Sequence, residues 1–362
     1  MTTRSHAVGA DAEVIDLDPL RRRGNARRTE PTTRARCAQT LAGGTTCRNY
    51  AGASGYCRVH EPEDSEQAAP RIQLPTGPTL AESRDFEEAV TKALAFLRRR
   101  LTGDYEVDIY GFDRELTEQV LMPLARPLYQ KYWRVRAVGL ENVPSDSGAL
   151  IVANHAGTLP FDAIMVKMAL LDEHPAHRHL RELAADLALR VPVVGPLARK
   201  TGNTLAHNDD ARRLLNSGEL VGVWPEGFKG IGKPYRDRYK LQRFGRGGFV
   251  EVALRTQAPI IPVAIIGSEE IYPIVANAKF LARIFGFPYF PITWQFPLLG
   301  PLGMLPLPSK WVIEFGDPID TARYGPEAAD DPMLVFELTD RVRDTIQQML
   351  YRNLMGRRSV FF

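Results

Sequence analysis

Three short apolar runs constrain the fold of this chain more than any other feature of its sequence. Residues 149–153 read ALIVA, residues 220–223 read LVGV, and residues 259–266 read PIIPVAII. Runs of this length that are rich in β-branched residues are typical of strands buried on both faces. Helical patterns separate the runs, and strands that alternate with helices build a mainly parallel sheet covered by helices. The sequence therefore predicts an α/β domain with a mixed, largely buried sheet flanked by helices.

Helical periodicity surrounds these runs. From Glu82 onward, apolar residues recur at three- and four-residue steps, which predicts an amphipathic helix. Residues 133–144 (WRVRAVGLENVP) are rich in β-branched and apolar residues and predict a strand before ALIVA. Further helices are expected at about 114–131, 162–171, 178–190, 209–217, 246–256 and 332–355.

The segment from Lys279 to Trp311 has an unusual composition. It is rich in aromatic residues, leucine and proline, and it contains no acidic residue. Prolines at this density exclude a long regular helix. Two interpretations stay open: a buried loop with a connecting strand, or an exposed apolar surface that enters a bilayer or covers an acyl chain.

The composition of the chain changes near residue 80. Residues 1–60 contain ten arginines against five carboxylate side chains and few large apolar residues. Such a segment buries too little apolar surface to offset the entropy of ordering it. The expected organisation is a disordered basic tail (1–35), a Cys/His module (36–61), a linker (62–80) and the main domain (81–362), whose first part (81–131) is helical.

The cellular setting follows from what the sequence does not contain. No stretch approaches about 18 uninterrupted apolar residues, which argues against a transmembrane helix. The first sixteen residues have no apolar core of a secretory signal. The net charge of +3 is too small for a protein coated in nucleic acid, so no nucleic-acid partner is expected. We expect a cytoplasmic protein that lies peripherally on the inner face of the cell membrane.

The first candidate site residues follow the run ALIVA. Ligands of open α/β sheets lie beyond the carboxyl ends of the strands, so His155 is expected at a cleft. A histidine near its reference pKa accepts a proton from a hydroxyl at neutral pH, and a carboxylate on its other ring nitrogen stabilises the imidazolium. Asp162 is the nearest candidate for that carboxylate. A strand-end histidine that caps a helix, with Asp162 as a favourable charge in its first turn, is the alternative.

A second group of candidates follows the run LVGV. Glycines at positions 227 and 230 allow a tight turn that exposes Glu226 at the edge of the sheet. Seven cations then occur between Lys229 and Arg246, with Asp237 as the one acid among them. This basic run suits phosphate groups or an anionic membrane surface, although a solvated loop has the same composition.

Taken together, these segments resemble the glycerolipid (lysophospholipid) acyltransferase family, whose members share four ordered sequence blocks. His155 and Asp162 correspond to the histidine and aspartate of the first block, and PEGFK (225–229) corresponds to the Pro-Glu-Gly-Thr-Arg block. The remaining matches are PVVGPLARKTG (192–202) before the second block, FGRGGF (244–249) with the Phe-Lys-Lys-Gly element, and PIIPVAI (259–265) with the fourth block.

The resemblance spans about residues 120–320 and implies a reaction. By this resemblance His155, held by Asp162, deprotonates an acceptor hydroxyl, and the alkoxide attacks the thioester of acyl-CoA or acyl-carrier protein. No catalytic cofactor is implied, and the absence of cysteine from residues 81–362 excludes a thiol nucleophile. The substrate-binding residues implied are Glu226 and Gly227 (acceptor pocket), Lys229 (an anionic group of the acceptor), Arg246 and Pro262, the characteristic proline of the fourth block.

The sequence departs from the family pattern in two places. Six residues separate His155 from Asp162, where the family usually has four, so the loop must bulge for the carboxylate to reach the imidazole. The second block usually ends in an arginine that contacts the acceptor's phosphate, and here the corresponding positions hold His207 and Asn208. A lysophospholipid acceptor and a neutral one, such as mono- or diacylglycerol, therefore both stay open.

All three cysteines lie in one short segment. Cys37, Cys47, Cys57 and His60 follow the pattern C-x9-C-x9-C-x2-H. Three cysteines and a histidine are a common ligand set of structural zinc, and this polar segment is too small to fold on an apolar core. We expect a structural zinc module that contacts a protein partner or a membrane; three unrelated thiols are the alternative.

Two different classes of function compete with acyl transfer. In a lipid hydrolase, His155 would activate water, although no G-x-S-x-G nucleophile elbow occurs in the chain. In a zinc-anchored binding protein, the acyltransferase-like domain would be inert. Release of CoA from an acyl-CoA discriminates among the three.

Overall fold

The computed structural model describes residues 35–51, 55–57, 59–60, 80–286 and 288–361. Internal contacts divide the chain into two units, Met1–Thr91 and Lys92–Phe362, and the division falls within helix α1 (Leu80–Thr102). Nearly all of the tail and linker expected at 1–35 and 62–80 lies outside the described residues.

The second unit is built on a seven-stranded sheet with the strand order β1-β9-β6-β2-β5-β3-β4. β2 is the middle strand, and it pairs in parallel with β5 and β6. β9 runs antiparallel to β6, and β1 runs parallel to β9, so the sheet is mixed. The strands are β1 (Arg136–Val138), β2 (Ala149–Ala153), β3 (Leu180–Ala184), β4 (Thr204–Leu205), β5 (Leu220–Val223), β6 (Ile260–Ile266) and β9 (Val312–Phe315).

Alternate residues of the central strands face two separate cores. On β2, Leu150 and Val152 belong to one apolar cluster, whereas Ala149, Ile151 and Ala153 belong to the other. Side chains alternate along a strand, so a run that is apolar at every position buries both faces of the sheet. The expected α/β fold with a mixed, buried sheet is confirmed.

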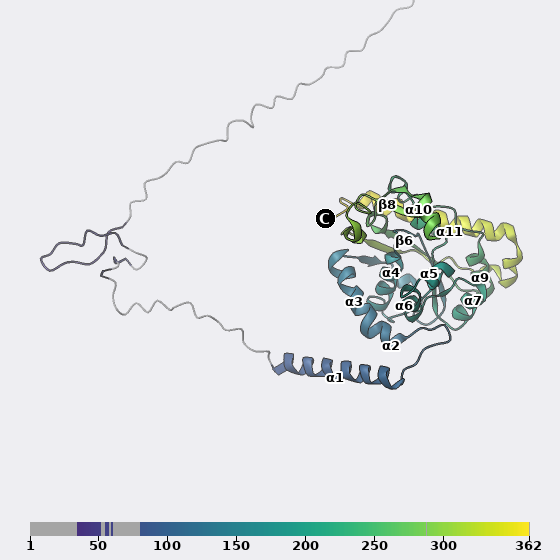
Figure 1. The fold of residues 1–362 in the computed structure, drawn as a ribbon, viewed down its shortest axis with the longest axis horizontal. Coiled ribbons are helices and arrows are strands. Elements are labelled where there is room, and N and C mark those ends of the chain that lie inside the picture. Colours follow the sequence, from purple (N-terminus) through teal and green to yellow (C-terminus); the bar gives the residue numbers. More distant parts are fainter. Residues whose placement is uncertain (1–34, 52–54, 58, 61–79, 287, 362) are drawn as a thin grey trace, which may run out of the picture. The chain divides into compact units, whose positions relative to one another are not determined.

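Helices cover each face of this sheet. The first cluster includes residues of α7 (Asn208–Asn216), α9 (Gly248–Thr256) and α11 (Pro332–Gly356). The second includes residues of α4 (Phe161–Asp172) and of α3 (Met122–Pro127) and its neighbouring turns. Figure 1 shows α11 on one side of β6, with α3 and α4 on the other.

Most of the expected helices form, with small shifts at their ends. Residues 114–132 form one helical stretch, in which α2 (Arg114–Leu116) and α3 alternate with two π-helical segments, Thr117–Leu121 and Leu128–Tyr132. Among the described residues, no helix is long and apolar enough to cross a bilayer.

The prediction of one helix over residues 178–190 is wrong. Residues Leu180–Ala184 form β3, and only Asp186–Arg190 is helical, as α5. The strand buries Arg181, whose Nη2 lies 2.5 Å from an oxygen of Asp108, and Glu182, which lies 3.2 Å from Lys167 Nζ. Both charges therefore pair with residues distant in sequence, and this tertiary context outweighs the local helix propensity.

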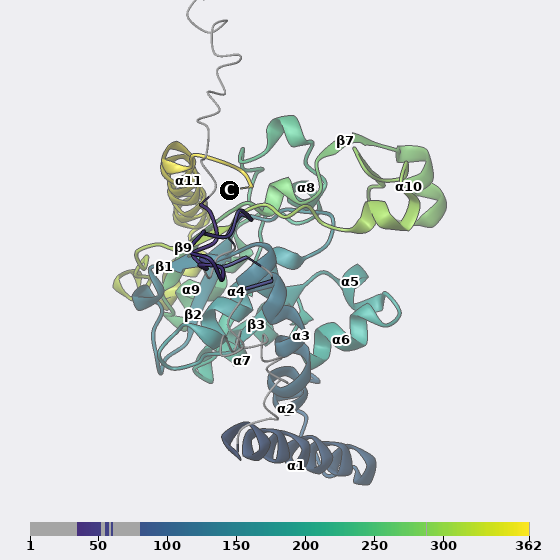
Figure 2. The ribbon, with the colours of Figure 1, turned by 90° about the vertical axis from the view of Figure 1, so that its left-hand side faces the viewer.

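The segment from Lys279 to Trp311 contains α10 (Lys279–Phe285), β8 (Pro291–Thr293) and a 3-10 turn (Gly300–Met304). β8 pairs antiparallel with β7 (Ile274–Asn277), and Figure 2 shows β7 and α10 projecting beyond the sheet. Its large side chains are mostly exposed, so the structure favours the interpretation as an apolar surface over that of a buried loop. The exposed residues include Phe280, Ile284, Trp294, Leu298, Leu299, Leu302, Met304 and Leu305.

Candidate active site at the carboxyl edge of the sheet

His155 and Asp162 meet where β2 ends, at the edge that we call the carboxyl edge. His155 lies two residues beyond β2, and Asp162 lies in the first turn of α4. His155 Nδ1 is 2.7 Å from Asp162 Oδ2, and the same oxygen accepts a hydrogen bond of 2.9 Å from the N–H of Ala156. The Asp162 side chain is fully buried, whereas 16% of the His155 side chain is exposed. A buried carboxylate thus orients an imidazole that reaches the surface.

The six-residue loop closes this contact by a turn within itself. Gly157 has a φ of +77°, in the left-handed region that glycine adopts at little cost. The N–H of Phe161 bonds the carbonyl of Leu159 at 2.8 Å, and the hydroxyl of Tyr289 bonds the carbonyl of Thr158 at 3.2 Å. The extra residues therefore turn back on themselves, and the side chain of Asp162 reaches the imidazole.

The electrostatics of His155 favour its protonated form. Burial lowers the pKa of the imidazole, but the charge and hydrogen bond of Asp162 outweigh burial, and Glu226 and Glu182 act in the same direction. The pKa of His155 is therefore raised above its ordinary value. An imidazole with a raised pKa binds a transferred proton more firmly.

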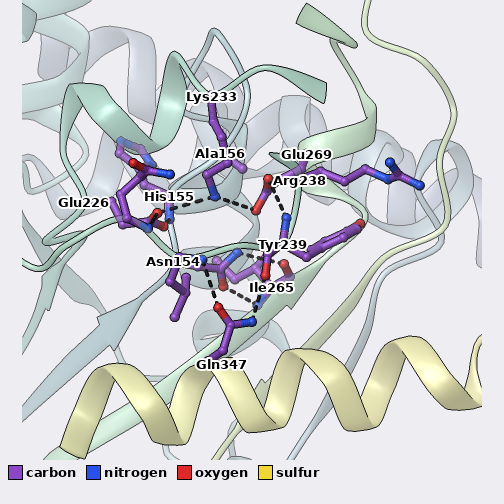
Figure 3. A network of polar contacts seen from close by, with 12 residues as sticks. Asn154, His155, Ala156, Glu226, Lys233, Arg238, Tyr239, Ile265, Glu269 and Gln347 are labelled. Carbon is purple, nitrogen blue, oxygen red and sulfur yellow. Dashed lines mark hydrogen bonds and ion pairs between the residues drawn. The ribbon is translucent and has the colours of Figure 1, made fainter. Parts of the chain in front are cut away.

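Glu226 joins the backbone of His155 to the turn after β5. Its Oε1 accepts from the N–H of His155 at 3.0 Å, and its Oε2 accepts from the N–H of Gln242 at 2.6 Å (Figure 3). Lys233 Nζ lies 3.4 Å from Oε2. The carboxylate is buried, so in this structure it holds the backbone of the loop after β2 in place.

The sequence reasoning missed the buried network behind Glu226. Lys233, which we had counted in the basic run, also pairs with Glu269 at 3.2 Å, and Glu269 accepts from the N–H of Tyr239 at 2.9 Å (Figure 3). Burial raises the pKa of Glu269 to about 7, although Lys233 acts against the shift. Asn154 completes the region by exchanging two hydrogen bonds, of 2.7 and 3.0 Å, with the backbone of Ile265. The spacing of these residues in the sequence does not predict that they pair.

The two glycines of the turn after β5 differ in their surroundings. Gly227 has a φ of +55° and precedes the short helix α8 (Phe228–Ile231). A Cβ at Gly230 would lie 2.7 Å from the Cβ of Glu226 and 2.9 Å from the carbonyl oxygen of His155. Gly230 therefore lets α8 pack directly against the backbone of His155.

Among the described residues, no hydrogen bond or ion pair joins the other expected substrate residues to His155 or Asp162. Lys229 and Arg246 are exposed, and neither side chain has an ion pair among the described residues. Pro262 lies within β6, where it is buried and its carbonyl accepts from the N–H of Gly316 at 2.8 Å. His207 caps α7 by accepting from the N–H of Asp209 at 3.2 Å.

A second buried ion pair lies on the α4 side of the sheet, and sequence reasoning missed it too. Lys167 of α4 pairs with Glu182 of β3, and Lys167 Nζ also donates to the carbonyl of Thr201 at 2.8 Å. Glu182 Oε1 and Trp224 Nε1 are buried with no hydrogen-bond partner among the described residues. The ring centres of Trp224 and His155 are 6.0 Å apart. The ring that carries the partnerless Trp224 Nε1 thus lies near the imidazole.

The first unit contains a cluster of possible metal ligands: Cys37, Cys47, Cys57 and His60. Their ligand atoms all lie within 4.8 Å of one another, and the three cysteines are buried. Cys47 Sγ is 3.9 Å from Cys57 Sγ, which is 3.3 Å from His60 Nδ1. Burial raises the pKa of the Cys57 thiol, but hydrogen bonds from the backbone of Val59 and from other neighbours outweigh burial and lower it to about 6.

Comparisons with known proteins identify a family and several relatives. A family model described as Acyltransferase matches residues 134–266. An uncharacterized protein of Mycobacterium tuberculosis is 59% identical over 287 residues, 79% of this chain and 80% of that protein. An uncharacterized protein of Mycobacterium leprae is 53% identical over 304 residues, 84% of this chain and 83% of that protein.

Two more distant matches have names that describe a reaction. A human protein named DGAT1/2-independent enzyme synthesizing storage lipids is 24% identical over 215 residues, which is 59% of each chain. The crystal structure of the 1-acyl-sn-glycerophosphate (LPA) acyltransferase PlsC from Thermotoga maritima gives a TM-score of 0.43 at 20% identity. This match covers 68% of our chain and 85% of that chain.

Proposed function

This chain belongs to the acyltransferase family and is an O-acyltransferase, and we propose that it moves a fatty acyl group from a thioester to a glycerolipid hydroxyl. The donor in this proposal is acyl-CoA or acyl-carrier protein. The observation that carries it is the 2.7 Å contact between His155 Nδ1 and Asp162, at an edge where part of the imidazole is exposed. Among the described residues, His155 Nε2 has no hydrogen-bond partner, so it is available to an acceptor hydroxyl.

The chemistry needs one base and one proton carrier. Nε2 of His155 takes the proton of the acceptor hydroxyl while the hydroxyl oxygen attacks the thioester carbonyl carbon. An O–C bond forms, the C–S bond breaks, and the proton passes from the imidazolium to the leaving thiolate. Asp162 stabilises the imidazolium between these two transfers.

CoA release in the presence of lysophosphatidate, lysophospholipid, monoacylglycerol or diacylglycerol tests this proposal. Because general-base assistance is worth about 10²–10⁴-fold, we expect His155→Ala to lose at least about 10²-fold in turnover. His177→Ala, at an exposed histidine, is the matched control and should leave the rate unchanged. Wild-type turnover by a folded His155→Ala protein would refute the mechanism. Release of free fatty acid without any acceptor would favour the hydrolase instead.

The acceptor is proposed to bind on the α4 side of the sheet, near Trp224 and Glu182. Their partnerless Nε1 and Oε1 atoms are one donor and one acceptor, and hydroxyls of a glycerol backbone can bond either kind. Burying such atoms without partners is costly, so a ligand that supplies both hydrogen bonds gains affinity. This argument favours acceptors that carry more than one polar oxygen near the reacting hydroxyl.

The exposed cation Lys229 is the residue that would bind a phosphate group of the acceptor. With His207 acting as a helix cap, Lys229 is the cation of the matched blocks that we assign to an acceptor phosphate. A neutral acceptor is supported by the name of the mammalian relatives, which refers to storage lipids. Lys229→Ala should raise the KM for lysophosphatidate and leave the KM for diacylglycerol unchanged. A wild-type KM for both acceptors would assign the phosphate, if there is one, to other residues.

We further propose that the apolar segment beside the site contacts a membrane. Phe280, Trp294 and Leu298 expose 72%, 66% and 84% of their surfaces, and Tyr289 of the same segment bonds the loop after His155. Lys279 and Arg283 of α10 add positive charge, which an anionic membrane attracts by about 1 kcal/mol per cation. A bilayer held there would supply the acceptor next to the imidazole.

Flotation with anionic liposomes tests this membrane contact. Binding should weaken as salt rises, because salt screens the attraction of the cations. Trp294→Ser combined with Leu298→Ser should reduce flotation at every salt concentration. Met333→Ser combined with Met355→Ser, at two exposed methionines of α11, is the matched control and should float like the wild type. Equal flotation of the two double variants would place the contact elsewhere.

For the first unit we propose a structural zinc ion. A tetrahedral ion with Zn–S bonds of about 2.3 Å and Zn–N bonds of about 2.0 Å places its sulfur atoms about 3.8 Å apart and sulfur and nitrogen about 3.5 Å apart. The contacts of Cys57 Sγ with Cys47 Sγ, 3.9 Å, and with His60 Nδ1, 3.3 Å, agree with this spacing. The N–H of Cys57 also donates to Cys37 Sγ at 3.1 Å, which stabilises a thiolate.

Metal analysis of the full chain tests the zinc proposal. We expect one zinc per chain, lost in Cys47→Ser and retained in Tyr50→Phe, a change at an exposed residue of the same unit. Absence of stoichiometric zinc from wild-type protein purified without chelator and supplied with zinc would overturn the proposal. Retention of zinc by Cys47→Ser would do the same.

A further inference from the structure

A pocket lies at the carboxyl edge, on the α11 side of the sheet. It is an open pocket of about 470 Å³ that is lined by Glu270, which follows β6 as His155 follows β2. Two of its cations, Arg238 and Lys240, come from the loop before α9, and two, Arg357 and Arg358, follow the end of α11. The fold therefore brings half of this positive charge from the basic run and half from the far end of the chain.

Most of this positive charge is available to a ligand. Arg358 is exposed and has no ion pair among the described residues, and Lys240 has only Asp237, at 3.6 Å. Arg357 already forms an ion pair within the pocket, since its Nη1 lies 2.7 Å from an oxygen of Glu270. Arg238 lies over the ring of Tyr235 and makes no ion pair among the described residues. Exposed cations that converge on one pocket are suited to phosphate groups.

Glu270 adds a requirement that phosphate alone does not meet. The residue is only 3% exposed, and its Oε2 has no hydrogen-bond partner among the described residues. A buried carboxylate oxygen without a donor costs free energy, so a fitting ligand offers an N–H or O–H group as well as phosphates. Tyr351, half exposed where it lines the pocket, presents an aromatic ring on which a base stacks. Phosphates, N–H donors and a flat ring occur together in a nucleotide.

We propose that this pocket binds the nucleotide end of a CoA thioester, with its phosphate groups on Lys240 and Arg358 and an N–H or O–H donor on Glu270. The inference rests on the proposed acyl transfer, because that reaction supplies the ligand. The assignment would select CoA over acyl-carrier protein as the donor, since the carrier protein presents no nucleotide.

The pocket adjoins the network that holds His155. Tyr239 lines the pocket, and its N–H bonds Glu269, which pairs with Lys233. Lys233 in turn pairs with Glu226, which bonds the N–H of His155 (Figure 3). Four successive contacts thus connect a residue of the pocket wall to the backbone of His155.

The test compares the variant Lys240→Ala/Arg358→Ala with a control that loses the same charge, Arg98→Ala/Arg341→Ala. The control residues are exposed and lie outside the pocket. Binding of CoA, adenosine 3′,5′-bisphosphate and inorganic phosphate is measured by calorimetry, and binding to phosphatidylglycerol vesicles by flotation. Kinetics are measured with an acyl-CoA and with the same acyl group on pantetheine, a thioester that lacks the nucleotide.

The expected pattern is specific to the nucleotide. The pocket variant should bind CoA and adenosine 3′,5′-bisphosphate at least about tenfold more weakly, and its KM for acyl-CoA should rise by a similar factor at unchanged kcat. Its KM for acyl-pantetheine and the behaviour of the control should match the wild type.

Three results would overturn the inference. They are unchanged CoA binding by the pocket variant, an equal rise of KM for both thioesters, and loss of vesicle binding alone, which would assign the pocket to lipid phosphates. Failure of the proposed function is distinguishable from these outcomes. In that case no thioester supports acyl transfer by the wild type, whatever the nucleotide binding shows.

Discussion

Replacing Asp162 with asparagine tests the proposed catalytic contact most directly. Asparagine keeps the size of the side chain but removes the charge that lies 2.7 Å from His155 Nδ1. Because Asp162 is fully buried, solvent screens little of this interaction. A charge-assisted hydrogen bond is worth about 1.5–3 kcal/mol, and two charges 4 Å apart near a protein surface interact by about 4 kcal/mol.

These magnitudes convert into a rate. If Asp162 stabilises the imidazolium of the transition state by about 2–4 kcal/mol, then Asp162→Asn should lower kcat by about 30- to 1,000-fold, at 1.36 kcal/mol per tenfold. The pH profile should also change. Burial lowers the pKa of His155 and the charge of Asp162 raises it, so the variant should have the lower pKa. Since the base acts in its neutral form, activity rises with pH through this pKa, and the acid limb should move to lower pH.

The assay is CoA release between about pH 5 and 9, with folding checked by thermal unfolding. Asp330→Asn, which removes a surface carboxylate paired with Arg255, is the matched control and should leave both kcat and the pH profile unchanged. A folded Asp162→Asn protein with kcat within threefold of the wild type and an unmoved acid limb would contradict the proposed role of Asp162.

Two further predictions concern the groups that hold the loop. Gly230→Ala should lower kcat more than tenfold, because its Cβ would lie 2.7 Å from that of Glu226 and 2.9 Å from the His155 carbonyl, whereas Gly245→Ala, with open space around it, should have no effect. Equal activity of these two variants would show that α8 does not position the imidazole. Burial raises the pKa of Glu269 from 4.5 to about 7. Between these pH values the folded protein keeps a proton on Glu269 that the unfolded chain has lost. The free energy of unfolding therefore decreases as pH rises through this interval. Glu269→Gln should therefore lose less stability between pH 4.5 and 7 than the wild type in thermal unfolding, and identical pH dependence would contradict this.

The sequence predicted the parts of the fold whose signals are local. The runs at 149–153, 220–223 and 259–266 become central strands, because a run that is apolar at every position can only be buried on both faces. Residues 178–190 were predicted wrongly because helix-forming residues lie on both sides of Arg181 and Glu182. Their partners, Asp108 and Lys167, are distant in sequence, so no local pattern indicates a strand there.

The candidate site likewise contains residues that local signals predict and contacts that depend on distant partners. Residue type and the position after a strand identified His155, Asp162 and Glu226 as candidates, because the carboxyl ends of parallel strands meet at one edge. The role of Glu226 was not predictable, since it depends on backbone N–H groups brought to it from two separate segments. The basic run predicted Lys233 to be one of many surface cations, yet the residue is buried between two carboxylates.

Local sequence pattern shows which runs are apolar at every position, which polar residues follow the strands, and that three cysteines and a histidine lie within 24 positions. The packing of distant segments brings Asp162 to His155 across six residues, buries Lys233, and gathers cations of the basic run and of the residues after α11 in the pocket at Glu270. Periodicity is local and records which face of an element is buried, whereas charge pairing and pockets depend on which distant segments the packed sheet brings into contact.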